Sequence, residues 1–226
     1  MKLCTEGYAI IDLPAASSEI LATFHDLPID PYSGGNHRYR RFSQYRMSFK
    51  DESWYLELLP HRPFIQSKEY NIYIGGIPRH LEPLKIDPTL QIDAGAKAIP
   101  LDISKTWQVN VHQCRVITDR SIRGISVPEG PHRDGHEFGM LAVFERYRIT
   151  GGENQLMPSN GGEPFFRTVL EKNQALIYDD GRMFHMATDI EPIGDELGYR
   201  HLWIVAFNQW ENRRYGPEFE KRAVLS

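Results

Sequence analysis

The residues Leu202 to Phe207, with the sequence LWIVAF, are apolar at every position and directly follow Gly198-Tyr199-Arg200-His201. A strand that is apolar on both faces needs cover on both sides, so we place this one inside a sandwich. Further strands are predicted over residues 107–118, 139–149 and 175–178, and most of them are flanked by turn-forming Gly, Pro or Asp. The second half of the chain therefore predicts a mainly β core.

The first hundred residues predict a mixture of short helices, strands and irregular segments. Ser17 and Ser18 can cap a short amphipathic helix. Residues 38–49 alternate charged, aromatic and small side chains, which predicts one or two strands with a polar face. A second short helix is expected over 52–59, and the Gly and Pro breakers between 71 and 100 predict irregular cover.

The composition supports a β-rich globular protein. Aromatic residues make up 12% of the 226 residues, and 15 Pro and 18 Gly favour short strands joined by tight turns over a helical bundle. We expect a single domain over 1–226, in which 1–100 supply helical and irregular cover plus outer strands and 101–226 supply the core.

Charge and cysteine content limit the partners and the compartment. The formal net charge of -4 gives no overall attraction to nucleic acid or to an anionic membrane. Cys4 and Cys114 are the only cysteines, which fits a reducing compartment. With no signal peptide and no bilayer-spanning segment in the sequence, we expect a cytoplasmic protein whose partner is a small molecule, with no nucleic acid and no membrane. A homodimer is compatible with the sequence.

A metal-binding pattern lies between turn-forming residues at His132-Arg133-Asp134. Side chains two apart in extended chain project to the same side, so His132 and Asp134 could grip one ion, with His185 as a third ligand after a later strand and turn. Two imidazoles and one carboxylate on one face are typical of non-haem Fe(II) oxygenases. The spacing alone is weak, because His80-Leu81-Glu82 has the same form, and a solvated turn histidine is the alternative.

Arg200 supplies context for this pattern because it enters the most apolar strand. A guanidinium inside a buried strand needs an anion. A cosubstrate such as 2-oxoglutarate chelates iron with its keto acid end. Its distal carboxylate could then form two hydrogen bonds with the guanidinium of Arg200. The alternative is an internal salt bridge, for instance to Asp179.

The chain as a whole resembles the bacterial 2-oxoglutarate and Fe(II) dioxygenases that include L-isoleucine 4-hydroxylase and related free amino-acid hydroxylases. The similarity covers most of the sequence. It is carried, in order, by Tyr39-Arg40-Arg41-Phe42, Gln66 to Asn71, Gly75-Gly76, Arg79, Val111 to Val116, His132-Arg133-Asp134, Gly151-Gly152-Glu153, Asp180 to His185 and Gly198-Tyr199-Arg200.

The resemblance implies a double-stranded β-helix, the jelly-roll or cupin-like form. It also implies that His132, Asp134 and His185 hold iron and that Arg200 holds the cosubstrate. Fe(II), 2-oxoglutarate and O2 would be used to hydroxylate an unactivated C–H of a free L-amino acid, with release of succinate and CO2. The choice of iron over zinc rests on this resemblance, because His and carboxylate ligands suit both metals. Related halogenating enzymes lack the metal carboxylate, and Asp134 is present here.

Candidate ligand-binding residues outside the triad come from strand alternation and from the resemblance. Gln113 and Arg115 follow apolar residues on one face of the strand over 107–118, which predicts contact with the cosubstrate (Gln113) or the substrate (Arg115); a solvent-exposed strand end is the alternative. Arg40 and Glu153 are candidates for the carboxylate and the ammonium of the substrate. His201, beside Arg200 but on the opposite strand face, is expected to be a packed core histidine.

Competing functions share parts of this pattern. The same chemistry could act on a macromolecule, and a cupin-like protein could use the metal without oxygen. A small substrate needs a closed lid, for which the turn over 33–36 and the loop over 87–100 are candidates, whereas a macromolecule needs an open groove. The basic and aromatic stretch 38–46 could be a nucleic-acid stripe, but no second basic cluster extends it.

Overall fold

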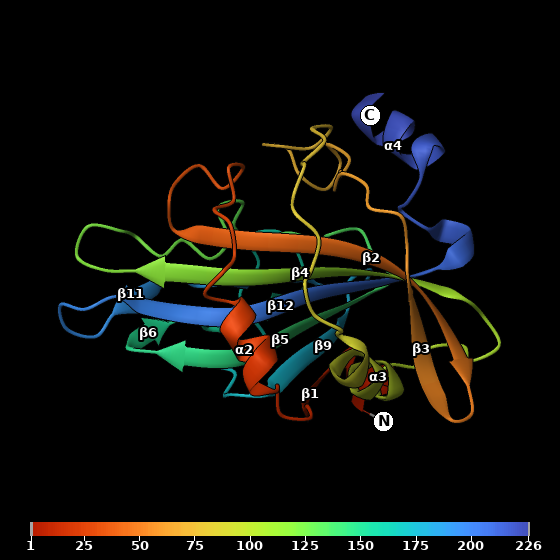
Figure 1. The fold of residues 1–226 in the computed structure, drawn as a ribbon, viewed down its shortest axis with the longest axis horizontal. Coiled ribbons are helices and arrows are strands. Elements are labelled where there is room, and N and C mark those ends of the chain that lie inside the picture. The colour runs from red at the N-terminus through yellow and green to blue at the C-terminus, as the bar shows by residue number, and fades with distance from the viewer. Residues whose placement is uncertain (1, 226) are drawn as a thin grey trace.

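The computed structural model describes residues 2–225, including their side chains except those of Lys2 and Cys4, and its largest element is a seven-stranded antiparallel sheet (Figure 1). In sheet order the strands are β1 (Tyr8–Asp12), β9 (Gln174–Asp179), β5 (Phe138–Tyr147), β12 (Gly198–Gln209), β4 (Trp107–Thr118), β2 (Arg38–Lys50) and β3 (Ser53–Leu58). The predicted strands near residues 107, 139, 175 and 201 are thus confirmed. The apolar run LWIVAF lies in β12, between β5 and β4.

Two smaller antiparallel sheets complete the β structure. One contains β10 (Phe184–Ala187), β7 (Asn154–Met157) and β8 (Phe166–Thr168), and the other pairs β11 (Ile190–Pro192) with β6 (Ile149–Gly151). Buried Val143 and Leu176 of the large sheet pack with Leu156 of β7 in one apolar cluster. Two antiparallel layers packed around an interior are the arrangement of a jelly roll, so the predicted fold class is confirmed.

Helices cover the outer face of the large sheet. They are α1 (Lys2–Glu6), α2 (Ser18–Thr23) and α3 (Thr89–Ala98), while the 3-10 helix η1 (Trp210–Asn212) and α4 (Pro217–Leu225) follow β12. Figure 1 shows α2 and α3 lying across one side of the sheet. Trp203, Val205 and Phe207 of β12 are buried beneath them, each contributing about 1.5–3 kcal/mol by burial. Helical cover from the N-terminal half is therefore confirmed.

The alternation of β12 decides which side chains enter the interior. Trp203 joins the core cluster under the helices, whereas Ile204 and Ala206 line an interior cavity. Because neighbouring residues of a strand point to opposite faces, Arg200 faces the interior and His201 faces the helices.

Two local predictions from the first hundred residues are wrong. The segment expected to be a helix over 52–59 is strand β3, which pairs with β2 through a tight turn in which Asp51 and Glu52 have φ of 48° and 60°. Trp54 is buried and Tyr55 is exposed, so the segment has the alternation of a strand. The stretch expected to be irregular over 71–100 contains the ten-residue helix α3.

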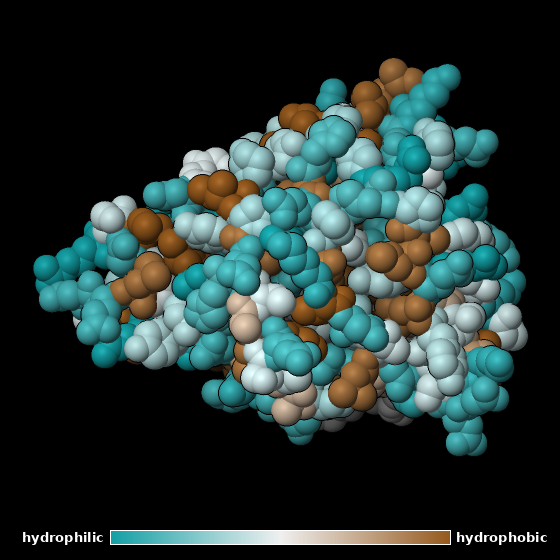
Figure 2. Space-filling view, in the orientation of Figure 1, coloured by the Kyte–Doolittle hydropathy of each residue, from teal (hydrophilic) through white to brown (hydrophobic). Residues whose placement is uncertain are grey.

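The face seen in Figure 2 carries apolar residues as separate patches among hydrophilic ones. Within residues 2–225, none of the helices combines the length and the apolar character that crossing a bilayer demands.

Candidate metal centre and the cavity beside it

A short antiparallel bridge brings two distant histidines together. The His132 N–H donates to the carbonyl of His185 at 3.1 Å, and the His185 N–H donates to the carbonyl of His132 at 2.8 Å. His185 lies in β10, and His132 lies in the turn that precedes β5. The two imidazole centroids are 4.4 Å apart as a result. Residues 53 positions apart in the chain thus converge as the sequence predicts.

Asp134 completes the cluster. One carboxylate oxygen lies 3.6 Å from Nε2 of His132, and the other lies 3.5 Å from Nε2 of His185. One donor atom from each residue lies within 4.8 Å of the others, which is the convergence that a single cation requires. The Gln66 side-chain amide also donates to Asp134 at 3.1 Å.

Further contacts orient the two imidazoles. Nδ1 of His132 lies 2.9 Å from the Gly130 carbonyl and donates to it, so Nε2, which faces Asp134, is the nitrogen that would bind a metal in place of a proton. Nδ1 of His185 lies 3.5 Å from the carboxylate of Asp180. That carboxylate is buried and accepts the backbone N–H groups of Asp134 and His136 at 3.1 and 2.8 Å. Asp180 therefore holds the turn through hydrogen bonds and lies beside the His185 imidazole, a position that no spacing in the sequence indicated.

The electrostatics of the cluster favour a bound cation. Burial lowers the pKa of His132, but hydrogen bonding and attraction to Asp134 outweigh it and raise the pKa to about 9. Burial raises the pKa of Asp134, yet the two histidines hold it well below its usual range. The carboxylate thus stays ionised between two nitrogen donors. This donor set fits a divalent metal and leaves room for further ligands.

Arg200 is a buried charge without a carboxylate partner. It is 1% exposed, and a terminal nitrogen of its guanidinium donates to the side-chain oxygen of Asn154 at 3.3 Å. Within the described residues no carboxylate reaches its guanidinium within 4.0 Å, and Asp179 instead accepts the Gly181 N–H. The alternative of an internal salt bridge is therefore excluded for these residues. Burial and the charge of Arg146 lower the Arg200 pKa to about 9.

Space for an anion exists beside this guanidinium. A Cβ at Gly152 would lie 3.0 Å from a terminal nitrogen of Arg146 and 3.4 Å from one of Arg200, so a side chain there would occupy that space. Nε of Arg200 and a terminal nitrogen of Arg146 are buried without hydrogen-bond partners. Unpartnered buried donors next to a glycine fit a carboxylate group.

One cavity of about 410 Å³ lies against the metal cluster and reaches Asn154, while Arg200, Arg146 and Gly152 are not among the residues that line it. Its wall includes the three residues of the cluster and Asn154, the partner of Arg200. The volume lies within the usual range of small-molecule sites, roughly 300–1,000 Å³.

Charged side chains line the other part of the cavity wall. Arg40 lies there as expected, but its guanidinium pairs with the fully buried Asp30 at 2.9 Å. Arg38 donates to the Ser126 carbonyl, and Arg79 donates to Gln66 at 2.7 Å; neither has a carboxylate partner within the described residues. Arg38 and Arg79 are thus better placed than Arg40 to donate hydrogen bonds to a bound anion.

Glu129 adds one acid to the same wall. It lies in the cavity lining and accepts the side-chain N–H of Asn71 at 3.0 Å, with no cation within 4.0 Å in the described part of the chain. The sequence contained Glu129 beside the His132 turn, but its role was missed because nothing in the local pattern separates it from a surface acid.

The structure does not place Gln113 or Arg115 in the cavity. In β4 the inner face carries His112, which lines the cavity, so the neighbouring Gln113 points outward and donates to Thr23 at 2.8 Å. Arg115 is also on the outer face, with its guanidinium 4.9 Å from the ring centre of Tyr199. The sequence correctly placed Gln113 and Arg115 on the same face of β4. That face was wrongly taken to line the cavity, because the outer face also carries polar groups, which the helices shield from solvent.

Glu153 and one lid candidate also lie away from the cavity wall. Glu153 accepts the side-chain amide of Gln155 at 2.7 Å and lies 3.5 Å from Arg167. Residues 87–100 contain α3 (Thr89–Ala98), which packs on the outer face, and none of them lines the cavity. Ser33 and Gly34 of the other lid candidate do line the cavity.

Comparisons with known proteins agree with this geometry. A family model described as 2OG-Fe dioxygenase matches residues 21–206. No curated protein matches the sequence. Among solved structures the chain is similar to a bsmA homolog from Methylobium petroleophilum, with a TM-score of 0.77 and 24% identity over 92% of this chain and 91% of that one. It is also similar to IDO from Bacillus thuringiensis, with a TM-score of 0.71 and 18% identity over 92% and 96% of the two chains.

A third similar structure is that of TqaL, an Fe(II)/(alpha)ketoglutarate-dependent dioxygenase, with a TM-score of 0.61 and 15% identity over 92% of this chain and 84% of that one. Identities this low show the shared fold. The family model, by contrast, covers well over half of the sequence and includes the whole cluster. The chain therefore belongs to the 2OG-Fe dioxygenase family, whose chemistry uses Fe(II), 2-oxoglutarate and O2.

Proposed function

We propose that this enzyme hydroxylates an unactivated C–H of a free L-amino acid or a similarly small amino acid, with release of succinate and CO2. In this proposal His132, Asp134 and His185 hold the iron, and Arg200 holds the distal carboxylate of 2-oxoglutarate. The observation that carries the proposal is the cavity of about 410 Å³ that joins the His-Asp-His cluster to separate cationic and anionic side chains.

The charges of the cavity wall match the two ends of an amino acid. Arg38 and Arg79 present guanidinium groups without a carboxylate partner, which suits a substrate carboxylate. Glu129 presents a carboxylate without a cationic partner within the described residues, which suits a substrate ammonium. A zwitterion would satisfy both kinds of group at once. Arg40 is not assigned to the substrate carboxylate in this proposal, because its charge is already neutralised by Asp30.

The protein's own contribution is positioning and exclusion of water. Bound iron supplies the activation of oxygen that is coupled to decarboxylation of 2-oxoglutarate. Asp180 orients His185, and the Gly130 carbonyl orients His132. The apolar side chains of Leu141 and Ile204 line the cavity and limit water near the reacting carbon.

The test is a turnover assay with purified protein, Fe(II), ascorbate, 2-oxoglutarate and a panel of free L-amino acids. We expect succinate formation with at least one member and a product that has gained one oxygen atom. Uncoupled decarboxylation without any hydroxylated amino acid would support the iron and cosubstrate assignments but contradict the substrate class. Activity on a peptide or an oligonucleotide only would favour the macromolecular alternative.

Substitution of Glu129 tests the ammonium assignment. Glu129→Gln keeps the size and the hydrogen bond to Asn71 but removes the charge. A hydrogen bond to a charged group contributes about 1.5–3 kcal/mol, so the KM for the amino acid should rise roughly 10- to 150-fold. Binding of 2-oxoglutarate should not change. Glu163→Gln, at an exposed acid outside the cavity lining, is the matched control. An unchanged KM in Glu129→Gln would contradict the assignment.

A further inference from the structure

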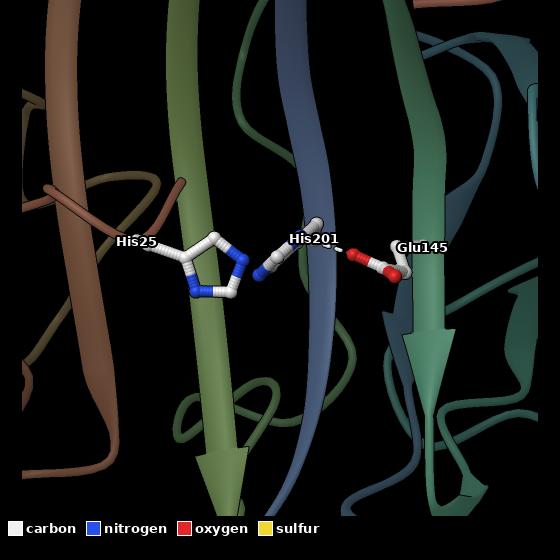
Figure 3. A group of neighbouring side chains, drawn as sticks. All are labelled: His25, Glu145 and His201. Carbon is white, nitrogen blue, oxygen red and sulfur yellow. Dashed lines mark ion pairs between the residues drawn. The ribbon is translucent and has the colours of Figure 1, made fainter. Parts of the chain in front are cut away.

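A second cluster of metal-ligating side chains lies on the outer face of the large sheet, away from the cavity. It consists of His25, Glu145 and His201, whose nearest donor atoms all lie within 4.8 Å of one another. Figure 3 shows His201 on β12 between Glu145 of β5 and His25, which reaches across β4 from the turn after α2. His201 and Arg200 are neighbours in the strand and point to opposite faces, so this cluster is separate from the metal centre.

His201 is the buried centre of the cluster. It is 0% exposed and lies between the rings of Phe24 and Tyr199, both at 4.5 Å between centroids. Nδ1 of His201 lies 3.0 Å from the carboxylate of Glu145, yet both ring nitrogens are buried without a hydrogen-bond partner. Fully buried imidazole nitrogens without partners are costly, and a metal ion beside Glu145 would satisfy Nδ1. The expectation of a packed core histidine is met, but packing alone leaves the nitrogens of this ring unexplained.

A β-bulge brings Glu145 to this face. In the pairing of β5 with β12, Glu145 lies opposite His201 and Val143 lies opposite Leu202, so Phe144 is an extra residue. A bulge re-aims the side chains beside it. Strict alternation from Val143, which packs in the interior cluster, would direct Glu145 to the interior. The bulge instead places its carboxylate beside a buried imidazole.

His25 supplies the exposed side of the cluster. Its ring lies 5.2 Å from that of His201 between centroids and is nearly perpendicular to it, at 85°. His25 is exposed and follows the C-cap of α2, so its side chain is free to adjust. The donor atoms of the three residues lie within 4.8 Å of one another. A metal at about 2.1 Å from each ligand requires them to be somewhat closer than this, and rotation of the His25 side chain can bring them together.

We propose that His25, Glu145 and His201 form a second divalent-metal site, suited to Zn²⁺, that ties the turn after α2 to strands β5 and β12. Two imidazoles and one carboxylate are a donor set that zinc accepts, with water in the fourth position on the exposed side. Burial, with the charges of Arg115 and His25, lowers the pKa of His201 to about 3, which keeps this imidazole in the neutral form that binds metals.

The test separates the two sites by removing the first. In a double variant with His132→Ala and Asp134→Ala, the first site loses two of its three ligands. We expect this variant to retain one Zn²⁺ per chain after equilibrium dialysis with zinc, measured by elemental analysis. Adding His25→Ala should lower the remaining zinc affinity at least about tenfold, the smallest effect typical of losing even an outer-shell partner.

Controls distinguish a metal site from surface binding and from misfolding. His80→Ala removes another exposed histidine and should leave zinc binding unchanged. Because His25 is exposed, its substitution should not alter the circular dichroism spectrum of the zinc-free protein. Zinc should raise the Tm of the double variant, and His25→Ala should reduce that rise. No zinc bound to the double variant, or equal binding with and without His25, would overturn the proposal.

Discussion

Replacement of Arg200 by methionine should weaken 2-oxoglutarate binding while leaving the fold as stable as before or more stable. The side chain is 1% exposed, its pKa is lowered to about 9, and its neutral partner Asn154 lies at 3.3 Å. In the protein without cosubstrate, this is a buried charge without a counterion, which is a cost to folding. Methionine has a similar length and no charge, so it removes that cost.

The effect on binding is opposite in sign. Loss of one partner of a buried charged pair costs about 2–5 kcal/mol, which corresponds to a Kd for 2-oxoglutarate roughly 30- to 5,000-fold higher. Isothermal titration of the metal-loaded protein measures this Kd, and urea unfolding without cosubstrate measures the free energy of unfolding. Arg167→Met, at a half-exposed arginine outside the cavity lining, should change neither.

Either of two results would refute the reasoning. A Kd changed by less than about threefold would show that Arg200 does not hold the cosubstrate. A loss of about 3–5 kcal/mol in the free energy of unfolding would show that Arg200 has a structural counterion after all.

Two other predictions follow from the groups around the cavity. Asp180→Asn should lower metal affinity about 10- to 100-fold, measured by metal titration, because Asp180 orients His185 and anchors the turn; Asp179→Asn, which lacks that contact, should not. Burial, then Arg40 and Arg79, hold the pKa of His112 well below 6.5, so the unfolded chain binds a proton that the folded chain does not. This term therefore lowers stability as pH falls below about 6.5, by up to about 1.4 kcal/mol per pH unit, and His112→Phe should flatten the urea-unfolding profile by that amount; a slope unchanged by the substitution would contradict it.

Much of the sheet could be predicted because its long strands carry strong patterns. The apolar run of β12 and the alternating β4 gave their positions within a few residues. The cluster of His132, Asp134 and His185 could be predicted because a pair at spacing two limits the geometry, and a single later histidine completes it. Even there, the resemblance to a family was needed to choose iron over zinc.

The missed elements have identifiable physical causes. Helix α3 contains Gly95, which the sequence analysis took as a breaker; a Cβ there would lie 2.4 Å from the sulfur of Met140, so the glycine allows the helix to approach the sheet. The turn between β2 and β3 places Asp51 and Glu52 at positive φ without the Gly or Asn that signals such turns.

The missed site residues depend on three-dimensional context. Both faces of β4 carry buried polar side chains, because one lines the cavity and the other is covered by α2, so alternation could not identify the side to which Gln113 belongs. Asp180 and Glu129 act through contacts with residues that are distant in sequence or through the cavity wall. Glu145 reaches His201 only because of a bulge, which leaves no mark in the local sequence.

The central claim is that three distant side chains hold one iron beside the cavity and that Arg200 binds the distal carboxylate of the cosubstrate. Its most direct test is a crystal structure with Mn²⁺ in place of iron and with 2-oxoglutarate, using anomalous diffraction to locate the metal. We predict a metal about 2.2 Å from Nε2 of His132, a carboxylate oxygen of Asp134 and Nε2 of His185, with the distal carboxylate on Arg200. A metal bound away from these three residues, or a cosubstrate carboxylate that does not contact Arg200, would contradict it.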